Sequence, residues 1–150
     1  MGEPAARLVG AARRLRDGEQ GSAVIEFVFL GVVLLVPLVY LIITASQVQA
    51  ASYAAIGAAD HAAKVFVGAP DEATARARAQ DAAARGASAM GLPASSATLS
   101  YSCSGPCLEP GTTVTVEVEV AIELPLLPPG VNAGIGSASA TATHRVERFG

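Results

Sequence analysis

The spacing of hydrophobic residues changes along the chain and divides it into segments of different predicted structure. Residues 27–59 contain no charged side chain, and residues 24–45, the most apolar part, carry only Glu26. A helix needs roughly 20 apolar residues to cross a bilayer, and a proline such as Pro37 is tolerated there. The pattern predicts a transmembrane helix over residues 22–45. A buried helix of a soluble domain is disfavoured, because the remainder has too few large apolar side chains to cover it.

The flanks of this segment predict its orientation. Residues 1–21 form a basic leader that contains Arg7, Arg13, Arg14 and Arg16, whereas no charge follows Ala45 until Asp60. Positively charged flanks stay on the cytoplasmic side of a membrane. We therefore expect a single-pass cell-membrane protein with a cytoplasmic N-terminus and an extracytoplasmic C-terminal part.

A conventional secretory signal is an alternative reading of the same residues. Val48, Gln49 and Ala50 resemble its cleavage site, and the mature chain would then start near Ala51. Such signals have a short apolar core of about 7–15 residues. The apolar stretch here is too long and begins at a glutamate, which disfavours this reading.

Residues 46–67 are expected to continue the helix outside the membrane as a stalk. Alanines at every fourth position form two adjacent rows, which are Ala50, Ala54, Ala58 and Ala62 beside Ala51, Ala55, Ala59 and Ala63. Small residues at this spacing let helices approach closely. The rows are either filler of high helix propensity or a packing strip against neighbouring subunits or the chain's own sheet. On the subunit reading, changing Ala54 and Ala58 together to leucine should impair assembly more than stability.

A second helix is predicted over about residues 71–89. Asp71 can cap its N-terminus, and Gly91-Leu92-Pro93 marks its far end. Glu72 with Arg76 and Asp81 with Arg85 are favourable i,i+4 pairs. Its apolar side would be mainly alanine together with Met90.

The hydrophobic period then changes from 3.6 to 2. The alternating apolar residues are Val114, Val116, Val118, Val120, Ile122 and Leu124, and Glu117, Glu119 and Glu123 fall on the opposite face. This alternation predicts a strand with one buried face and one solvated face. Weaker alternation predicts further strands at about 97–103 and 137–147. We expect an α+β fold: a long N-terminal transmembrane and stalk helix, a second short helix, and an antiparallel meander of about three strands in an extracytoplasmic domain, residues 68–150. The helices would cover its apolar face.

The two cysteines, Cys103 and Cys107, flank a turn sequence between the first two strands. Outside the membrane such a pair most often forms a disulfide. A metal or redox site would need more ligands.

Residues 124–129, rich in leucine and proline, cannot continue a central strand. They are read equally well as a loop that covers the core or as a contact patch.

Composition and motifs narrow the function classes. The net charge of -3 and the absence of a basic stripe argue against nucleic-acid binding. No phosphate-binding loop, dinucleotide motif or nucleophile elbow occurs. Asp60, His61 and Lys64 are read as solvated helix surface, with Asp60 and Lys64 as an i,i+4 pair. No catalytic residue, metal site, cofactor or small-molecule substrate is expected, so the chain is not predicted to be an enzyme.

Glu26 is the most informative residue, because a carboxylate in an apolar membrane segment is costly and usually has a partner or a function. Four residues separate Gly21 from Glu26-Phe27, after a short basic leader and before a long apolar run. This arrangement resembles the type IV prepilin head. The resemblance implies that a prepilin peptidase cuts between Gly21 and Ser22 on the cytoplasmic side. It also implies that Glu26 pairs with the new terminal amine of a neighbouring subunit during assembly, with Phe27 completing the motif.

More narrowly, the chain is similar to the TadE-like minor pseudopilins of the tight-adherence (Tad/Flp) pilus systems. The resemblance rests on the seven-residue head, and the outer domain matches in layout only. It implies contacts with membrane lipid, the peptidase, other pilin or pseudopilin subunits and the Tad assembly platform, and possible incorporation in a surface pilus. The competing hypothesis is an uncleaved, membrane-anchored extracytoplasmic binding or accessory domain.

Overall fold

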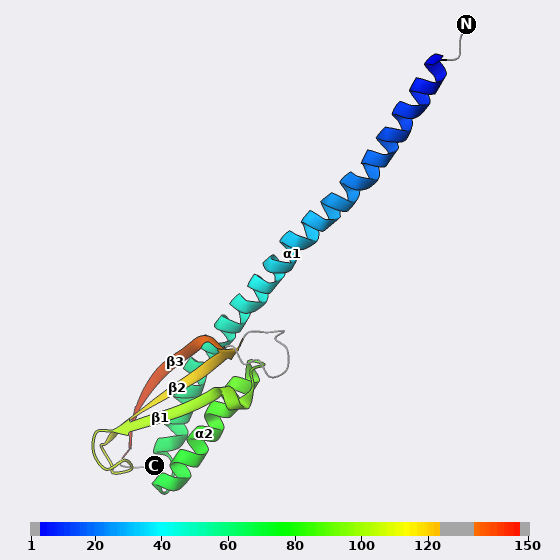
Figure 1. Ribbon diagram of the computed structural model, residues 1–150. Coiled ribbons are helices and arrows are strands. Elements are labelled where there is room, and N and C mark those ends of the chain that lie inside the picture. Colours follow the sequence, from blue (N-terminus) through cyan, green and yellow to red (C-terminus); the bar gives the residue numbers. More distant parts are fainter. Residues whose placement is uncertain (1–3, 124–133, 148–150) are drawn as a thin grey trace. The chain divides into compact units, whose positions relative to one another are not determined.

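The computed structural model describes the backbone of residues 4–123 and 134–147, and the side chains of residues 22–123 and 134–147. The chain divides into two compact units, Met1–Ile42 and Ile43–Gly150. Helix α1 (Pro4–Val67) contributes residues to both units (Figure 1). The other elements, α2 (Glu72–Ala89), a short 3-10 helix η1 (Ala94–Ser96), β1 (Ala97–Cys103), β2 (Thr113–Glu123) and β3 (Gly134–Arg145), all lie in the second unit. The expected α+β class is confirmed.

The described part of the first unit, residues 4–42, is helical backbone that includes Pro37 within α1. Its valine, leucine, isoleucine and phenylalanine side chains from Val24 to Ile42 are 46–75% exposed. Residues 22–67 meet the length and hydropathy criteria for a membrane-crossing helix, and the most apolar window of that stretch is not buried inside the protein. This differs from the core helix of a soluble protein, in which the apolar window is mostly covered.

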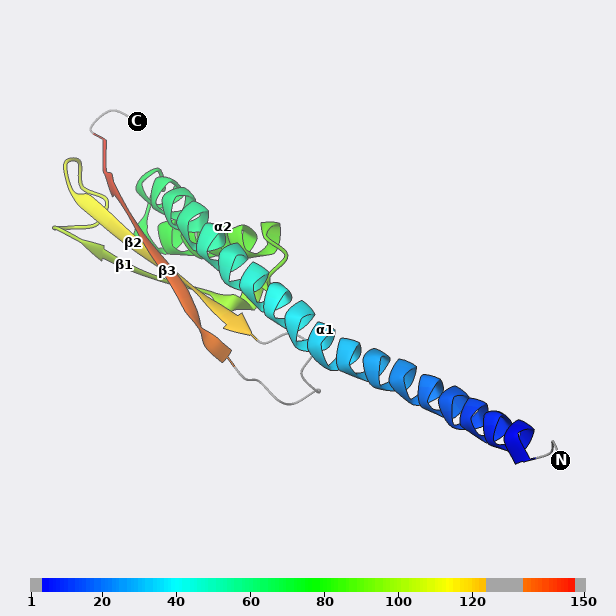
Figure 2. The ribbon, with the colours of Figure 1, turned by 90° about the horizontal axis from the view of Figure 1, so that it is seen from above.

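The sheet of the second unit has the order β1-β2-β3, with both pairs antiparallel, as the meander prediction requires. β2 is central, and its apolar side chains (Val114, Val116, Val118, Val120 and Ile122) are at most 5% exposed. Glu117, Glu119 and Glu123 lie on the solvated face. Both helices cover the same face of the sheet (Figure 2), and their side chains form one core with those of β2.

Seven of the eight alanines in the two rows on α1 are buried in this core, and Ala50 is partly buried against it. The buried residues are Ala51, Ala54, Ala55, Ala58, Ala59, Ala62 and Ala63. The structure therefore shows the strip packed inside the chain's own core, which is one of the two possibilities that the sequence left open. Leucines at Ala54 and Ala58 would enter this filled core, so we expect them to impair folding of the second unit as well as any assembly.

α2 packs beside α1 through alanine and glycine. Ala75, Ala79, Ala82, Ala83 and Ala87 are its buried residues. Met90, which we expected on this apolar side, is instead 48% exposed. The reason is that α2 ends at Ala89, and Gly91 turns the chain with φ 75° before Leu92 enters the core.

The strand bounds differ from the sequence-based ranges by at most three residues. β3 begins at Gly134, before the predicted residue 137, and its start pairs with Glu123 through an irregularity in register. Beyond Arg145, Val146 still exchanges backbone hydrogen bonds with Gly111 and Thr112, each 2.9 Å long. Leu124 and the following proline-rich segment lie outside the described residues.

Candidate functional site

The predicted processing and assembly motif lies on helical backbone. Gly21 and Ser22 are within α1, and the described side chains of Ser22, Glu26 and Phe27 are exposed. A protease must reach an unwound peptide bond, so cleavage here requires local opening of the helix. Gly18 and Gly21 favour such opening, because each glycine in a helix costs about 1 kcal/mol relative to alanine.

The surface that follows Glu26 is chemically uniform. Every described side chain in the range 27–42 is uncharged, and the large apolar ones are exposed on all sides of the helix. A helix that is hydrophobic all round requires an apolar environment, either lipid or other helices. A single carboxylate at one end of such a surface gains most from a cationic partner, since an unpaired charge is costly in low dielectric.

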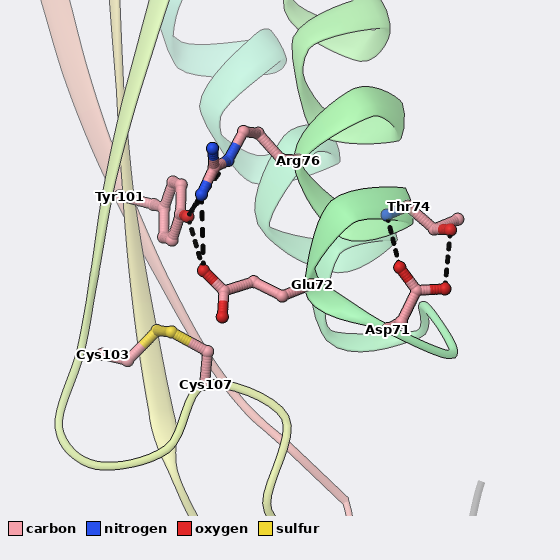
Figure 3. A network of polar contacts seen from close by, with 7 residues as sticks. All are labelled: Asp71, Glu72, Thr74, Arg76, Tyr101, Cys103 and Cys107. Atoms are coloured by element: carbon pink, nitrogen blue, oxygen red, sulfur yellow. Dashed lines mark hydrogen bonds and ion pairs between the residues drawn. A yellow bond between two sulfur atoms is a disulfide. The ribbon is translucent and has the colours of Figure 1, made fainter.

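A polar network joins α2 to β1 in the second unit (Figure 3). Arg76 donates from Nη2 to the Tyr101 hydroxyl at 2.6 Å and from Nε at 3.2 Å, and that hydroxyl donates to Glu72 Oε1 at 2.8 Å. The Tyr101 ring also contacts Phe66 of α1, with centroids 4.7 Å apart. The hydroxyl of Tyr101 is the main reason that the pKa of Arg76 is raised. These contacts are structural, because one tyrosine ties two helices to the edge of the sheet.

The sequence indicated the Glu72–Arg76 pair, which the structure contains with a 3.5 Å separation. It did not indicate Tyr101 as the third member. Tyr101 lies 25 residues beyond Arg76, and only the placement of α2 against β1 brings them together.

Asp71 caps α2 as expected. Its Oδ1 accepts from the backbone N–H of Thr74 at 2.8 Å, and its Oδ2 accepts from the Thr74 hydroxyl at 2.8 Å. The Thr74 backbone hydrogen bond is the largest cause of the lowered pKa of this carboxyl. The predicted Asp81–Arg85 ion pair is also present.

The Asp60–Lys64 pair is formed on α1 at 2.7 Å. Asp60 Oδ1 also lies 3.2 Å from Nε2 of His144 on β3, a contact that the sequence did not indicate. His61 is exposed and is not part of this contact. All three groups of the cluster are at least 31% exposed, so it is a surface link between a helix and a strand.

Cys103 and Cys107 form the predicted disulfide, with their Cα atoms 5.2 Å apart (Figure 3). It closes a short loop at the end of β1. Within the described ranges no group of three or more histidine, cysteine, aspartate or glutamate residues could hold a metal ion.

A depression of about 500 Å³ lies beside Pro110, Gly111 and Arg145. There Arg145 donates from Nε to the Gly111 carbonyl at 3.1 Å. The guanidinium therefore holds the β1–β2 connection against β3.

The apolar surface of residues 24–42, together with Glu26, is the strongest candidate functional feature of the described chain.

Comparison of the chain with models of protein families, with curated proteins and with solved structures finds no match.

Proposed function

We propose that this chain is a structural minor pseudopilin of a Tad/Flp-type pilus or secretion apparatus, cut by a prepilin peptidase after Gly21. The observation that carries the proposal is the head itself: Gly21, then Glu26-Phe27, then an apolar helical surface exposed on all sides. The protein would act by association of its N-terminal helix with lipid and with other subunits, and not by catalysis.

The electrostatics of the head support this role. Cleavage would create an ammonium group at Ser22, four residues before Glu26. Within one helix the two groups lie one turn apart, and in neighbouring subunits they could pair directly. Each would lower the desolvation cost of the other in an apolar surrounding. The leader would be removed while the apolar helix stayed attached.

The second unit supplies what an extracytoplasmic part of such a subunit needs. Its core is closed by two helices and a sheet, and its loop at Cys103 is held by a disulfide, which suits an oxidising compartment.

The competing function is an uncleaved, membrane-anchored accessory domain. The unbroken helix through Gly21 favours this rival, because the peptide bond is not presented to a protease.

The intact mass of the full chain, extracted from membranes of a cell that contains a Tad apparatus, distinguishes these functions. A chain that starts at Ser22 supports processing, one that starts at Met1 supports the uncleaved anchor, and one that starts near Ala51 supports a secretory signal. Gly21→Leu should block processing, whereas Gly18→Ala, a matched change one helical turn earlier, should not. Since cleavage alone does not place the chain in a filament, co-purification with pili is the second measurement.

A further inference from the structure

The two ends of the second unit differ in charge. At one end the chain passes from α1 into α2, and this end carries Asp60, Lys64, Asp71, Glu72 and Arg76. The opposite end, where α1 enters the unit, is called the entry end here. It is formed by residues 43–56 of α1, the last turn of α2 with the residues after it (86–97), the end of β2 (121–123) and the start of β3 (134–138) (Figure 1, Figure 2). In these four ranges Glu123 is the only charged residue.

Three large side chains of the entry end are exposed. Tyr53, Met90 and Ile135 are 67%, 48% and 42% exposed, and they come from α1, the residue after α2, and β3. The core does not need them, because Leu92 and Ile122 at the same end enter it. Single exposed apolar residues are ordinary on a soluble surface. Here, however, three of them share an end that has almost no charge.

The entry end also lies close to the predicted membrane span. A Cβ on Gly86 would overlap Ala58 and lie 3.6 Å from the Ala54 carbonyl oxygen. Since α2 runs antiparallel to α1 after a short connection, Met90 lies one turn further toward the membrane side, near the level of Ala54. Residue 54 follows the end of the predicted span, residue 45, by nine residues, or about 14 Å of helix.

A bilayer reaches across most of this distance. Its headgroup layer adds about 5–7 Å on each side of the hydrocarbon. Transmembrane helices are tilted by about 20° on average, and such a tilt lowers one side of an attached unit by several ångströms. The side chains of the entry end are therefore within reach of the headgroup layer.

We propose that the entry end rests in the headgroup layer of the bilayer, with Met90, Ile135 and Tyr53 as its lipid contacts. The inference rests on the membrane anchoring in the proposed function and goes beyond it, because it assigns lipid contacts to α2 and the sheet as well as to the N-terminal helix. Tyrosine is enriched at membrane–water interfaces, and a surface with little charge loses little hydration on entering them. Glu123 disfavours anionic lipid, so the expected partner is a zwitterionic lipid surface. The contact would tilt α1 toward α2 and the sheet.

Fluorescence quenching of the full chain in phosphatidylcholine vesicles tests the proposal. Both native cysteines are in the disulfide, so Met90→Cys and Ile135→Cys each supply one free thiol for an environment-sensitive label, attached without reductant. Lipid that carries a nitroxide near its headgroup should strongly quench the label at both positions. Ala77→Cys, at an exposed position of α2 about 20 Å along the helix from residue 90, is the matched control and should keep its fluorescence. Circular dichroism checks that each labelled chain is folded.

A label on Leu35→Cys, which is 57% exposed within the predicted span, reports the anchoring separately. Quenching at residue 35 but not at both 90 and 135 would retain the anchor and overturn the proposal. Equal quenching at residue 77 would mean that the unit has no preferred end on the membrane, and blue-shifted emission without quenching at 90 and 135 would mean that protein covers them. Either result overturns the proposal. Without quenching at residue 35 the anchor itself fails, and the proposal fails with it. Processing is measured independently, because a chain that starts at Met1 and is quenched at 90 and 135 retains this contact and removes the cleavage.

Discussion

A Cβ built on Gly86 of α2 would lie 2.7 Å from the Cβ of Ala58 in α1. The same Cβ would lie 3.3 Å from the Ala58 Cα and 3.6 Å from the Ala54 carbonyl oxygen. The two helices thus meet where one has no side chain and the other has a single methyl group. The distance between α1 and α2 at this point is therefore set mainly by backbone atoms and not by flexible side chains.

Gly86→Ala should therefore destabilise the protein, although alanine is the better helix former. Overpacking a filled core costs about 1–3 kcal/mol, and the gain in helix propensity is about 1 kcal/mol. Gly57→Ala is the matched control, because its Cβ meets nothing within 4 Å, and it should be neutral or stabilising. Thermal unfolding of the full chain in detergent measures both. Equal shifts of Tm in the two variants would contradict the close contact at Gly86.

Leucines at Ala54 and Ala58 should prevent normal folding of the second unit. Both alanines are at most 2% exposed, and each enlargement is expected to cost about 1–3 kcal/mol. The control is Ala73→Leu with Ala77→Leu, at exposed positions of α2. Protease resistance and Tm should fall for the first pair only. If the Ala54 and Ala58 variant kept its full Tm and lost only pilus association, the alanine face would instead be a subunit interface.

Removing the disulfide should weaken the fold without abolishing it. Cys103 and Cys107 lie four positions apart in the sequence, with three residues between them, and closing so small a loop contributes about 2 kcal/mol in the chain-entropy model. The double substitution to serine, measured by chemical denaturation against the oxidised chain, should lower the free energy of unfolding by that amount. Wild type in reductant is the control and should behave like the variant. A loss several times larger would mean that the loop supports more of the sheet than its contacts indicate.

The cap of α2 should contribute to the pH dependence of stability. The pKa of Asp71 is lowered from 3.8 in the folded protein, chiefly by the Thr74 backbone N–H. At pH values above the pKa of Asp71 in the unfolded chain, the carboxylate stabilises the fold. This contribution is lost as the pH falls through the lower pKa that Asp71 has in the folded protein. Asp71→Asn retains a capping side chain but does not titrate. The Tm difference between the two proteins should be constant above about pH 5 and change only below about pH 4. A difference that varied near neutral pH would assign the effect to another group.

Glu26→Gln should separate assembly from folding and from processing. The amide is nearly the same size as the carboxylate but cannot pair with an ammonium group as an ion. Under the proposed function the variant should still be cut after Gly21 and should fold normally, while the amount that co-purifies with pili falls strongly. Glu123→Gln, on the solvated face of β2, is the matched control. Undiminished recovery of the Glu26 variant with pili would argue against the assembly role.

The central strand was predictable because its period is unambiguous. β2 alternates strictly, and every described valine in the pattern is buried while every described glutamate is exposed. The cap at Asp71 and the disulfide were predictable because both depend on residues close together in sequence.

The packing partners were not predictable in the same way. Alanine rows suit a sheet, a second helix or another subunit equally well, so sequence alone left the partner of Ala54 and Ala58 open. Contacts such as Arg76–Tyr101 and Asp60–His144 join residues 25 and 84 positions apart. They depend on how the helices lie against the sheet, and the spacing of residues within one helix or strand does not indicate that arrangement.

The alanine face also has a consequence for biosynthesis. The stretch of α1 that it occupies is complete well before β2, its partner in the core, has been made. The part of that face that β2 covers therefore stays exposed for a further fifty or so residues of chain growth, which takes about 3–10 seconds at ordinary rates of synthesis, although α2 follows sooner. During this time an alanine exposes less apolar surface than a leucine would at the same position. The alanine face therefore lowers the tendency of the unfinished chain to aggregate.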